Sequence, residues 1–421
     1  MKDGAHSEEA FRTEVRRLLR RNFAAHLAHG LLGQTGFRLI NAPTFIPAYV
    51  HLLSGSDLAV GVARGLQSLG MALSPILGAT LIEHRRRVLP VGFVVGALMR
   101  VQVLGIALAA FLLPPPIALV AVCVGLGLFG VFLGMQGVVF SFLLSKVIPV
   151  EARGRLLGLR NALAGLTAAA VAVLAGYWVE HETLGNGFGT TFLAAFVLSS
   201  AGLVCLLFVR EPETPRVREA VRVHERLRDL PALLRADPDF TRYFLARALG
   251  TMGRMSVPFY VIYAGTKMEI GGAQLGVLTL AFVLAQSVVN LLWGWIADRS
   301  GFRLVFLLAQ TLWIGSGAAL LVSADYPVLV GVMIGLGAGL GGFMMAAQNL
   351  VLEFGSRHNL PLRIALANSS SELVGAVAPL SAGLLAATVG YRAVFATAIA
   401  FQLAALLLMA VWVREPRHRA G

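Results

Sequence analysis

Charged residues are scarce in this chain of 421 residues: they make up 14%, against about 25% in an average soluble domain. Hydrophobic residues make up 57%, which is more apolar surface than a water-soluble globule of this length can bury. This composition excludes a disordered chain and a coiled coil. The cysteine count of two excludes a disulfide-rich scaffold. A polytopic membrane protein remains, and its 46 glycines would let membrane helices approach closely.

Acidic residues are also few, at 22 against 35 lysines and arginines, so the net charge is +13. In a soluble protein this excess would suggest a nucleic-acid partner. In a membrane protein it has a simpler explanation, because cytoplasmic loops concentrate lysine and arginine. We therefore expect the lipid bilayer, and no nucleic acid, to be the partner of the basic residues.

Apolar stretches long enough to span a bilayer, which takes about 20 residues, occur twelve times. They cover roughly 24–50, 58–82, 88–113, 117–147, 156–179, 190–209, 242–264, 272–297, 303–322, 327–352, 364–387 and 392–413. With an even number of spans, both termini lie on one side. That side receives 27 lysines and arginines and the other side two, which predicts cytoplasmic termini in a multi-pass protein of a bacterial inner membrane.

Internal repeats divide these spans into two halves. Val209-Arg210-Glu211-Pro212 at the end of the sixth span recurs as Val413-Arg414-Glu415-Pro416 at the end of the twelfth. This repeat, six spans apart, predicts an all-α membrane protein of twelve transmembrane helices in two pseudo-symmetric six-helix bundles. Such an architecture is typical of transporters. The predicted units are an amphipathic cytoplasmic arm (1–22), a first bundle (23–209), a cytoplasmic central loop (210–241) that includes a helix at 219–234, a second bundle (242–413) and a cytoplasmic tail (414–421).

The most specific motif lies between the eighth and ninth spans and reads Gly294-Trp295-Ile296-Ala297-Asp298-Arg299-Ser300-Gly301-Phe302-Arg303. It resembles the loop signature Gly-x-Leu-Ala-Asp-Arg-x-Gly-x-Arg of the major facilitator superfamily. The resemblance implies a twelve-span secondary transporter, not an enzyme, and we expect it to work as a monomer without a cofactor. Its glycines would permit a tight turn and close helix contact, and its aspartate would bind a helix N-terminus or an arginine.

Such a cluster would latch the two bundles together on the cytoplasmic side. The first-half counterpart at 78–87 lacks the aspartate and the second glycine, and Glu83 is the candidate substitute. The stretch 149–155 resembles the family's loop between the fourth and fifth spans. The predicted latch residues are Gly294, Asp298, Arg299, Gly301, Arg303, Glu83 and Arg153.

Polar residues inside the spans are the candidates for substrate binding, since a charge at the bilayer centre costs about 2.5–3.5 kcal/mol. Gln34, Arg38 and Asn41 share one face of the first span, and Arg254 lies centrally in the seventh. In the resembled fold these helices line the central cavity with the fourth and tenth. Members that carry organic phosphates bind the anion with one arginine from each half. The alternative is that each arginine is structural. The predicted substrate-binding residues are Arg38, Arg254, Gln34, Asn41, Gln348 and Asn349.

Other intramembrane residues allow fewer conclusions. Glu372 is the only acid well inside a span, so it is either the proton carrier or a salt-bridge partner of Arg254 or Arg247. Arg64 lies nearer the end of its span, where its side chain could reach the interface. His26 and His29 have no carboxylate or cysteine close in sequence, so we predict no metal site.

The leading hypothesis is a secondary transporter of a small anionic organic solute, because six intramembrane arginines outnumber the intramembrane acids. Uniport, proton coupling and exchange all stay open. The first alternative is proton-driven efflux of amphipathic drugs or lipids, which the lack of a Gly-Pro motif in the fifth span disfavours. A sensor or scaffold that transports nothing comes next. A membrane enzyme is least favoured, because we find no nucleotide signature or nucleophile elbow.

Overall fold

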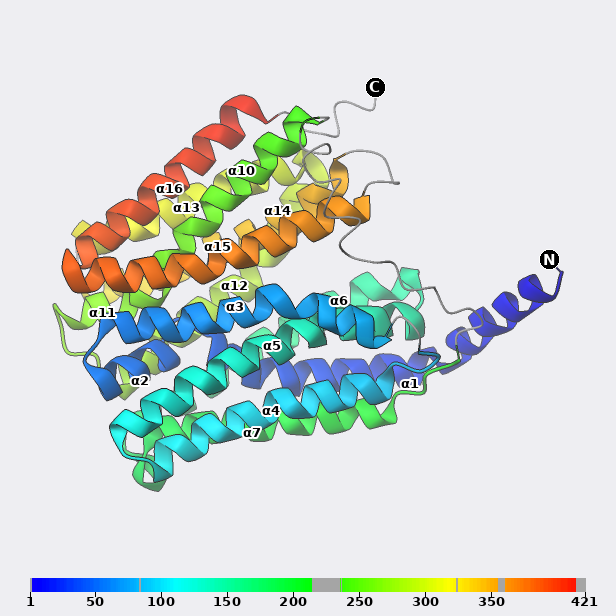
Figure 1. The fold of residues 1–421 in the computed structure, drawn as a ribbon, viewed down its shortest axis with the longest axis horizontal. Helices are drawn as coiled ribbons and strands as arrows, with labels where there is room; N and C mark the ends of the chain where they lie inside the picture. Colours follow the sequence, from blue (N-terminus) through cyan, green and yellow to red (C-terminus); the bar gives the residue numbers. More distant parts are fainter. Residues whose placement is uncertain are drawn as a thin grey trace.

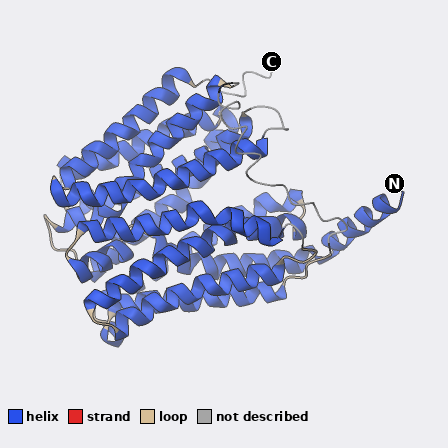
Figure 2. Cartoon of the chain, in the orientation of Figure 1, coloured by secondary structure: helices blue, strands red, loops and turns tan. Residues whose placement is uncertain are grey.

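The computed structural model describes residues 2–82, 85–213, 235, 237–322, 325–354 and 360–413. These residues form helices and short connections without a β-strand (Figure 2). The predicted helix at 219–234, Glu83 and the tail from 414 onward lie outside the described residues.

Ten helices of the described residues are long and apolar enough to cross a membrane. They are α3 (Asp57–Ile82), α4 (Leu89–Leu112), α5 (Pro115–Val147), α6 (Val150–Glu180), α7 (Gly187–Cys205), α12 (Gly272–Ser300), α13 (Phe302–Val322), α14 (Tyr326–Asn349), α15 (Leu360–Thr388) and α16 (Tyr391–Trp412). Short 3₁₀ segments follow three of them: η1 (Thr183–Gly185), η2 (Leu206–Phe208) and η4 (Leu350–Glu353).

The first and seventh spans are interrupted helices. The first consists of α1 (Lys2–Asn41) and α2 (Phe45–Ser54), and the seventh of α10 (Pro238–Met252), η3 (Gly253–Phe259) and α11 (Tyr260–Gly265). Helices are present at both predicted spans, 24–50 and 242–264, but each span is divided into shorter helical segments. Pro43 and Pro258 explain the difference, because proline lacks the N–H that an α-helix needs and disfavours helical geometry in the residue before it. The basic arm and the first span form one helix, since α1 begins at Lys2.

The helices form two bundles, α1–α7 and α10–α16, as predicted (Figure 1). Helix α3 packs against α15, and α6 packs against α12, so these two pairs join the bundles. The start of α1 and the last turn of α16, at Trp412, lie toward the same end of the molecule. We call this end the terminal face and the opposite end, near Ser54, Glu180 and Thr388, the distal face.

Glycines bring the bundles together near the distal face. A Cβ atom on Gly176 of α6 would lie 2.5 Å from the carbonyl oxygen of Gly272 in α12. A Cβ on Gly61 of α3 would lie 3.0 Å from the Cα of Gly383 in α15. Side chains larger than hydrogen would force these helices apart. Toward the terminal face the bundles diverge (Figure 1).

Two carboxylates of the first bundle add polar contacts to the distal face. The Tyr391 hydroxyl of α16 donates to Oδ1 of Asp57 at 2.7 Å. The backbone N–H of Ala273, in the first turn of α12, donates to Oε2 of Glu180 at 3.1 Å. A carboxylate at a helix N-terminus is favourable because the helix dipole is positive there. The structure is therefore closed by direct contacts at the distal face.

Candidate functional site

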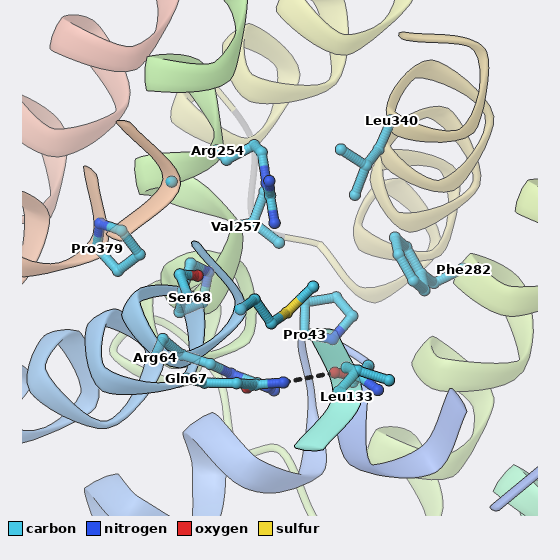
Figure 3. Close-up of a pocket in the computed structure, with 14 residues that line it drawn as sticks. Pro43, Arg64, Gln67, Ser68, Leu133, Arg254, Val257, Phe282, Leu340 and Pro379 are labelled. Atoms are coloured by element: carbon cyan, nitrogen blue, oxygen red, sulfur yellow. Dashed lines mark hydrogen bonds between the residues drawn. The ribbon is translucent and has the colours of Figure 1, made fainter. Parts of the chain in front are cut away.

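A central cavity of about 280 Å³ lies between the two interrupted helices (Figure 3). Asn41 and Pro43 line it at the interruption of the first span, and Arg254 and Pro258 line it at the interruption of the seventh. Irregular backbone at membrane depth occurs where it is buried in protein or lines a cavity, and interrupted helices in corresponding positions of two halves point to a transporter's binding site. The interruptions therefore make this cavity the candidate binding site.

Arg64 of α3 contributes the first cation of the cavity. Its Nη2 donates to the carbonyl oxygens of Ala42 at 2.8 Å and Ile40 at 3.2 Å. Its Nη1 donates to Oε1 of Gln67 at 2.8 Å. Carbonyls at the end of a helix have no intrahelical donor. Arg64 therefore supplies donors to the carbonyl groups where α1 stops.

Arg254 of η3 contributes the second cation, from the opposite bundle. Within the described ranges its guanidinium has no hydrogen-bond or ion-pair partner. Arg254 and Arg64 line the same cavity, so their like charges repel each other there. Figure 3 shows both side chains directed into the same cavity. The cavity thus holds two arginines from different bundles that share no counter-ion within the protein that the structure describes.

Glu372 lies close to Arg254 without an ion pair between them. A Cβ atom on Gly375 would lie 3.4 Å from Nη1 of Arg254 and 4.0 Å from Oε2 of Glu372. Oε2 of Glu372 is buried and has no hydrogen-bond partner in the described part of the chain. Arg247 donates instead to Oδ1 of Asn368 at 2.9 Å. Neither salt bridge expected as the alternative for Glu372 is formed.

Apolar side chains complete the wall of the cavity. Met71 and Leu133 come from the first bundle, and Phe282 and Leu340 from the second. The helices expected from the resembled fold are all represented, because Leu133 belongs to α5, the fourth span, and Leu340 to α14, the tenth. The cavity therefore combines a cationic centre with an apolar wall.

The structure brings only two of the predicted substrate-binding residues, Asn41 and Arg254, into this cavity. Arg38 is directed between the bundles, where Nη1 donates to Oγ of Ser287 in α12 and Nη2 to the carbonyl oxygen of Asn161 at 3.4 Å. Gln34, Gln348 and Asn349 do not line the cavity. Asn349 donates to the carbonyl oxygen of Met345 at 2.8 Å, near the terminal face.

The sequence analysis did not place Arg64 in the cavity, because the residue lies near the end of its span and was expected to reach the membrane interface. A signal was present in the sequence, since Arg64, Gln67, Ser68 and Met71 follow the i, i+3, i+4, i+7 spacing of one helical face. All four line the cavity. A polar helix face of this length indicates that the helix lines a water-accessible cavity. It does not fit a single arginine side chain that extends to the membrane–water interface.

Three of the predicted latch residues, all arginines, make contacts within their own bundles. Arg303 donates to the carbonyl oxygens of Met409 and Ala410, at 3.3 and 2.7 Å. Arg153 donates to the carbonyl oxygen of Ile148 at 2.8 Å, and Arg299 lies 3.8 Å from the ring centroid of Trp295. Asp298 is exposed at the terminal face.

The two glycines of the signature differ. Gly301 ends α12 with φ of +83°, a conformation that residues with a Cβ rarely adopt, so the tight turn is as predicted. Gly294 lies inside α12, and a Cβ atom there would meet no atom within 4 Å. The close helix contact expected for Gly294 is therefore not present in this structure.

Two arginines inside the first bundle have roles that the sequence did not reveal. Arg100 donates to the carbonyl oxygens of Gly96 and Ser199, each at 2.6 Å. Arg160 lies 4.2 Å from the ring centroid of Phe140. His26 and His29 pack against the same ring. In the described residues, no three histidine, cysteine or acidic side chains gather in a way that could hold a metal ion.

The fold and the cavity define a multi-pass membrane transporter. The family model of the Major Facilitator Superfamily matches residues 30–266 and 243–421. The chain therefore belongs to the Major Facilitator Superfamily, a family of secondary transporters and not of enzymes.

Solved structures with this fold are distant in sequence. A D-xylose–proton symporter is 14% identical, with a TM-score of 0.73 over 94% of this chain and 98% of that one. A nucleoside transporter is 13% identical, with a TM-score of 0.70 over 92% and 100%. A human organic anion transporter is 16% identical, with a TM-score of 0.62 over 93% and 99%. No curated protein sequence matches the chain. At these identities the structures show the fold alone.

Proposed function

We propose that this transporter moves a small anionic organic solute through the central cavity by alternating access. One observation carries the proposal. Arg64 and Arg254, from opposite bundles, line the same cavity, and no carboxylate is bonded to either within the described residues. A cation inside the membrane without a counter-ion is costly, and a bound anion would compensate both charges.

The geometry favours a solute with an anionic group and an apolar body. Guanidinium groups stay charged and bind carboxylate or phosphate through two parallel N–H donors. The side chains of Met71, Leu133 and Phe282 would contact the apolar part of the solute. A human organic anion transporter shares the fold, which is consistent with this substrate class.

The further predicted binding residues belong to the same proposal. Asn41 lines the cavity and would offer a neutral hydrogen bond. Arg38 is bonded to Ser287 here, so we propose that Arg38, with Gln34, Gln348 and Asn349, contacts the solute in another state of the transport cycle. Glu372, whose Oε2 is buried near Arg254, is the proposed proton carrier if transport is coupled to protons.

Orientation follows from the charge distribution. We propose that the terminal face is cytoplasmic, because the segments on the predicted cytoplasmic side of the sequence carry 27 of the 35 lysines and arginines. The structure would then be closed to the outside and open to the cytoplasm. In this state the proposed latch would be released, which is consistent with the contacts that Arg303 and Arg153 make within their own bundles.

Proton-driven efflux of amphipathic drugs or lipids is the second candidate. Its supporting observation is the apolar wall of Met71, Leu133, Phe282 and Leu340. Efflux of cationic drugs would need an acidic cavity, whereas the charges that line this one are Arg64 and Arg254. A matched set of ligands therefore separates the two candidates.

A thermal-shift panel of four compounds of similar size tests the proposal: benzoate, phenyl phosphate, benzyl alcohol and benzylamine. A ligand that binds only the folded state, at a free concentration of 100 times its Kd, stabilises the protein by about 2.7 kcal/mol. We expect the two anions to raise the Tm of the wild type and not of Arg254→Gln. If benzylamine or benzyl alcohol stabilises the protein as well as the anions do, the anion proposal is wrong and the efflux candidate leads.

A further inference from the structure

The interruption of the first span connects the cavity to the distal closure. On the cavity side, the carbonyl oxygens of Ile40 and Ala42 accept hydrogen bonds from Arg64. On the other side, Thr44 lies in the same interruption, and its Oγ1 is 2.7 Å from Oγ1 of Thr279 in α12. Both threonines are fully buried. The three residues 42–44 are thus held by a cation in the cavity and by the opposite bundle.

Helix α2 extends this connection to the distal face. It follows the interruption directly and packs against α11, which belongs to the second bundle. Its residues Phe45, Ile46 and Tyr49 are almost completely buried. A change in the geometry of residues 42–44 would therefore alter the position of α2 and the contact between the bundles at the distal face.

Arg64 cannot serve the interruption and an anion equally well. A guanidinium carries five N–H donors in a fixed planar fork. Both terminal nitrogens, Nη1 and Nη2, already donate to Gln67, Ile40 and Ala42. A bidentate contact with a carboxylate or phosphate requires two parallel donors aimed at the anion. Turning the fork toward an anion beside Arg254 would withdraw donors from the carbonyl groups of the interruption.

We propose that Arg64, besides contacting the anion, couples anion binding to opening of the distal face. An anion between Arg64 and Arg254 draws the Arg64 guanidinium away from Ile40 and Ala42. The released carbonyls lose their donors, the interruption changes shape, and the contact of Thr44 with Thr279 and of α2 with α11 loosens. This inference rests on the proposed function, because it takes the anion as the ligand.

Spin-label distances across the distal face test the coupling. The labels are placed at Leu184→Cys and Glu269→Cys, which are exposed at the distal ends of the two bundles, in a protein without Cys123 and Cys205. A second pair, Leu184→Cys and Leu113→Cys, lies within the first bundle and reports any general loosening. Each pair is measured without ligand and with saturating phenyl phosphate.

We expect the wild type to show a single short distance without ligand and a longer component with phenyl phosphate. Arg64→Gln removes the donors of the interruption, so it should raise the long component about tenfold without any ligand, as expected for a lost buried hydrogen bond. Thr44→Val, which keeps the side-chain size, should do the same. Arg254→Gln leaves the interruption of the first span intact, so the distance between the labels should stay short with and without phenyl phosphate.

The possible failures are distinguishable. If phenyl phosphate raises the Tm of the wild type but Arg64→Gln and Thr44→Val both keep the short distance, the coupling is wrong and anion binding stands. If phenyl phosphate does not bind but both variants lengthen the distance without ligand, the link through the interruption holds and the anion proposal fails. If Arg64→Gln does not fold, Thr44→Val alone decides whether the interruption controls the distal face.

Discussion

Arg38 of α1 donates a hydrogen bond to the Ser287 hydroxyl of α12, across the interface between the two bundles. Gly165 of α6 makes this contact possible, because a Cβ atom at Gly165 would overlap the Ser287 side chain and lie 3.1 Å from Nη1 of Arg38. Three helices from two bundles therefore meet around a glycine. In this state Arg38 joins the bundles and does not face the cavity.

Gly165→Ala should separate α6 from α12 and destabilise the distally closed state. Overpacking of this kind typically costs about 1–3 kcal/mol. Ser287→Gly removes the overlapping atoms, so the double variant Gly165→Ala/Ser287→Gly should recover most of the loss. The measurement is the unfolding midpoint of all four proteins in detergent. If the loss of stability in the double variant equals the sum of the losses in the two single variants, the two side chains do not compete for this space.

Arg254→Lys should bind anions poorly although it keeps the charge. Lysine lacks the planar fork, so one charge-assisted hydrogen bond is lost, which is worth about 1.5–3 kcal/mol, or roughly 10- to 150-fold in Kd. Titration of phenyl phosphate by calorimetry measures this directly. Arg242→Lys is the control, since Arg242 is a half-exposed arginine near the terminal face that pairs with Asp239. If Arg254→Lys binds phenyl phosphate with the same Kd as the wild type, Arg254 does not bind the anion and its role is structural.

Tyr391→Phe should open the distal face in part. The substitution removes the hydrogen bond to Asp57 and keeps the ring that packs against Phe259 and Tyr263. A hydrogen bond at a partly exposed carboxylate is worth about 1 kcal/mol, so the open population should rise roughly fivefold. Labels at residues 184 and 269 report it. Tyr177→Phe, on an exposed tyrosine of α6, is the control and should leave the distance distribution unchanged.

The proposed orientation predicts which faces an impermeant thiol reagent reaches in intact cells. Leu184 is 71% exposed at the distal face, and Thr13 is exposed on the terminal side of α1. In a background without Cys123 and Cys205, Leu184→Cys should be labelled and Thr13→Cys should be labelled only after the cells are opened. The reverse pattern would place the basic face outside.

The bundles were predictable from the sequence because hydropathy and the positions of lysine and arginine act over single spans. Arg254 could be placed in the cavity for a similar reason, as a central residue on a polar helical face. The partner of Arg38 could not be found in this way, since Ser287 is 249 positions away and the contact depends on how the bundles meet. The position of Arg64 likewise depends on where the first span is interrupted, and a continuous helix would have left its guanidinium without the carbonyls of Ile40 and Ala42.

Anion transport through the cavity is the central claim, and uptake by proteoliposomes tests it most directly. The protein is reconstituted, the vesicles are loaded with the anion from the four-compound panel that stabilises it most, and entry of the same labelled anion is followed. The wild type and Glu269→Gln, a change at an exposed acid outside the cavity, should accumulate the label above empty liposomes. Arg254→Gln and Arg64→Gln should not. Equal uptake by all four proteins would contradict the claim that these two arginines form the anion site.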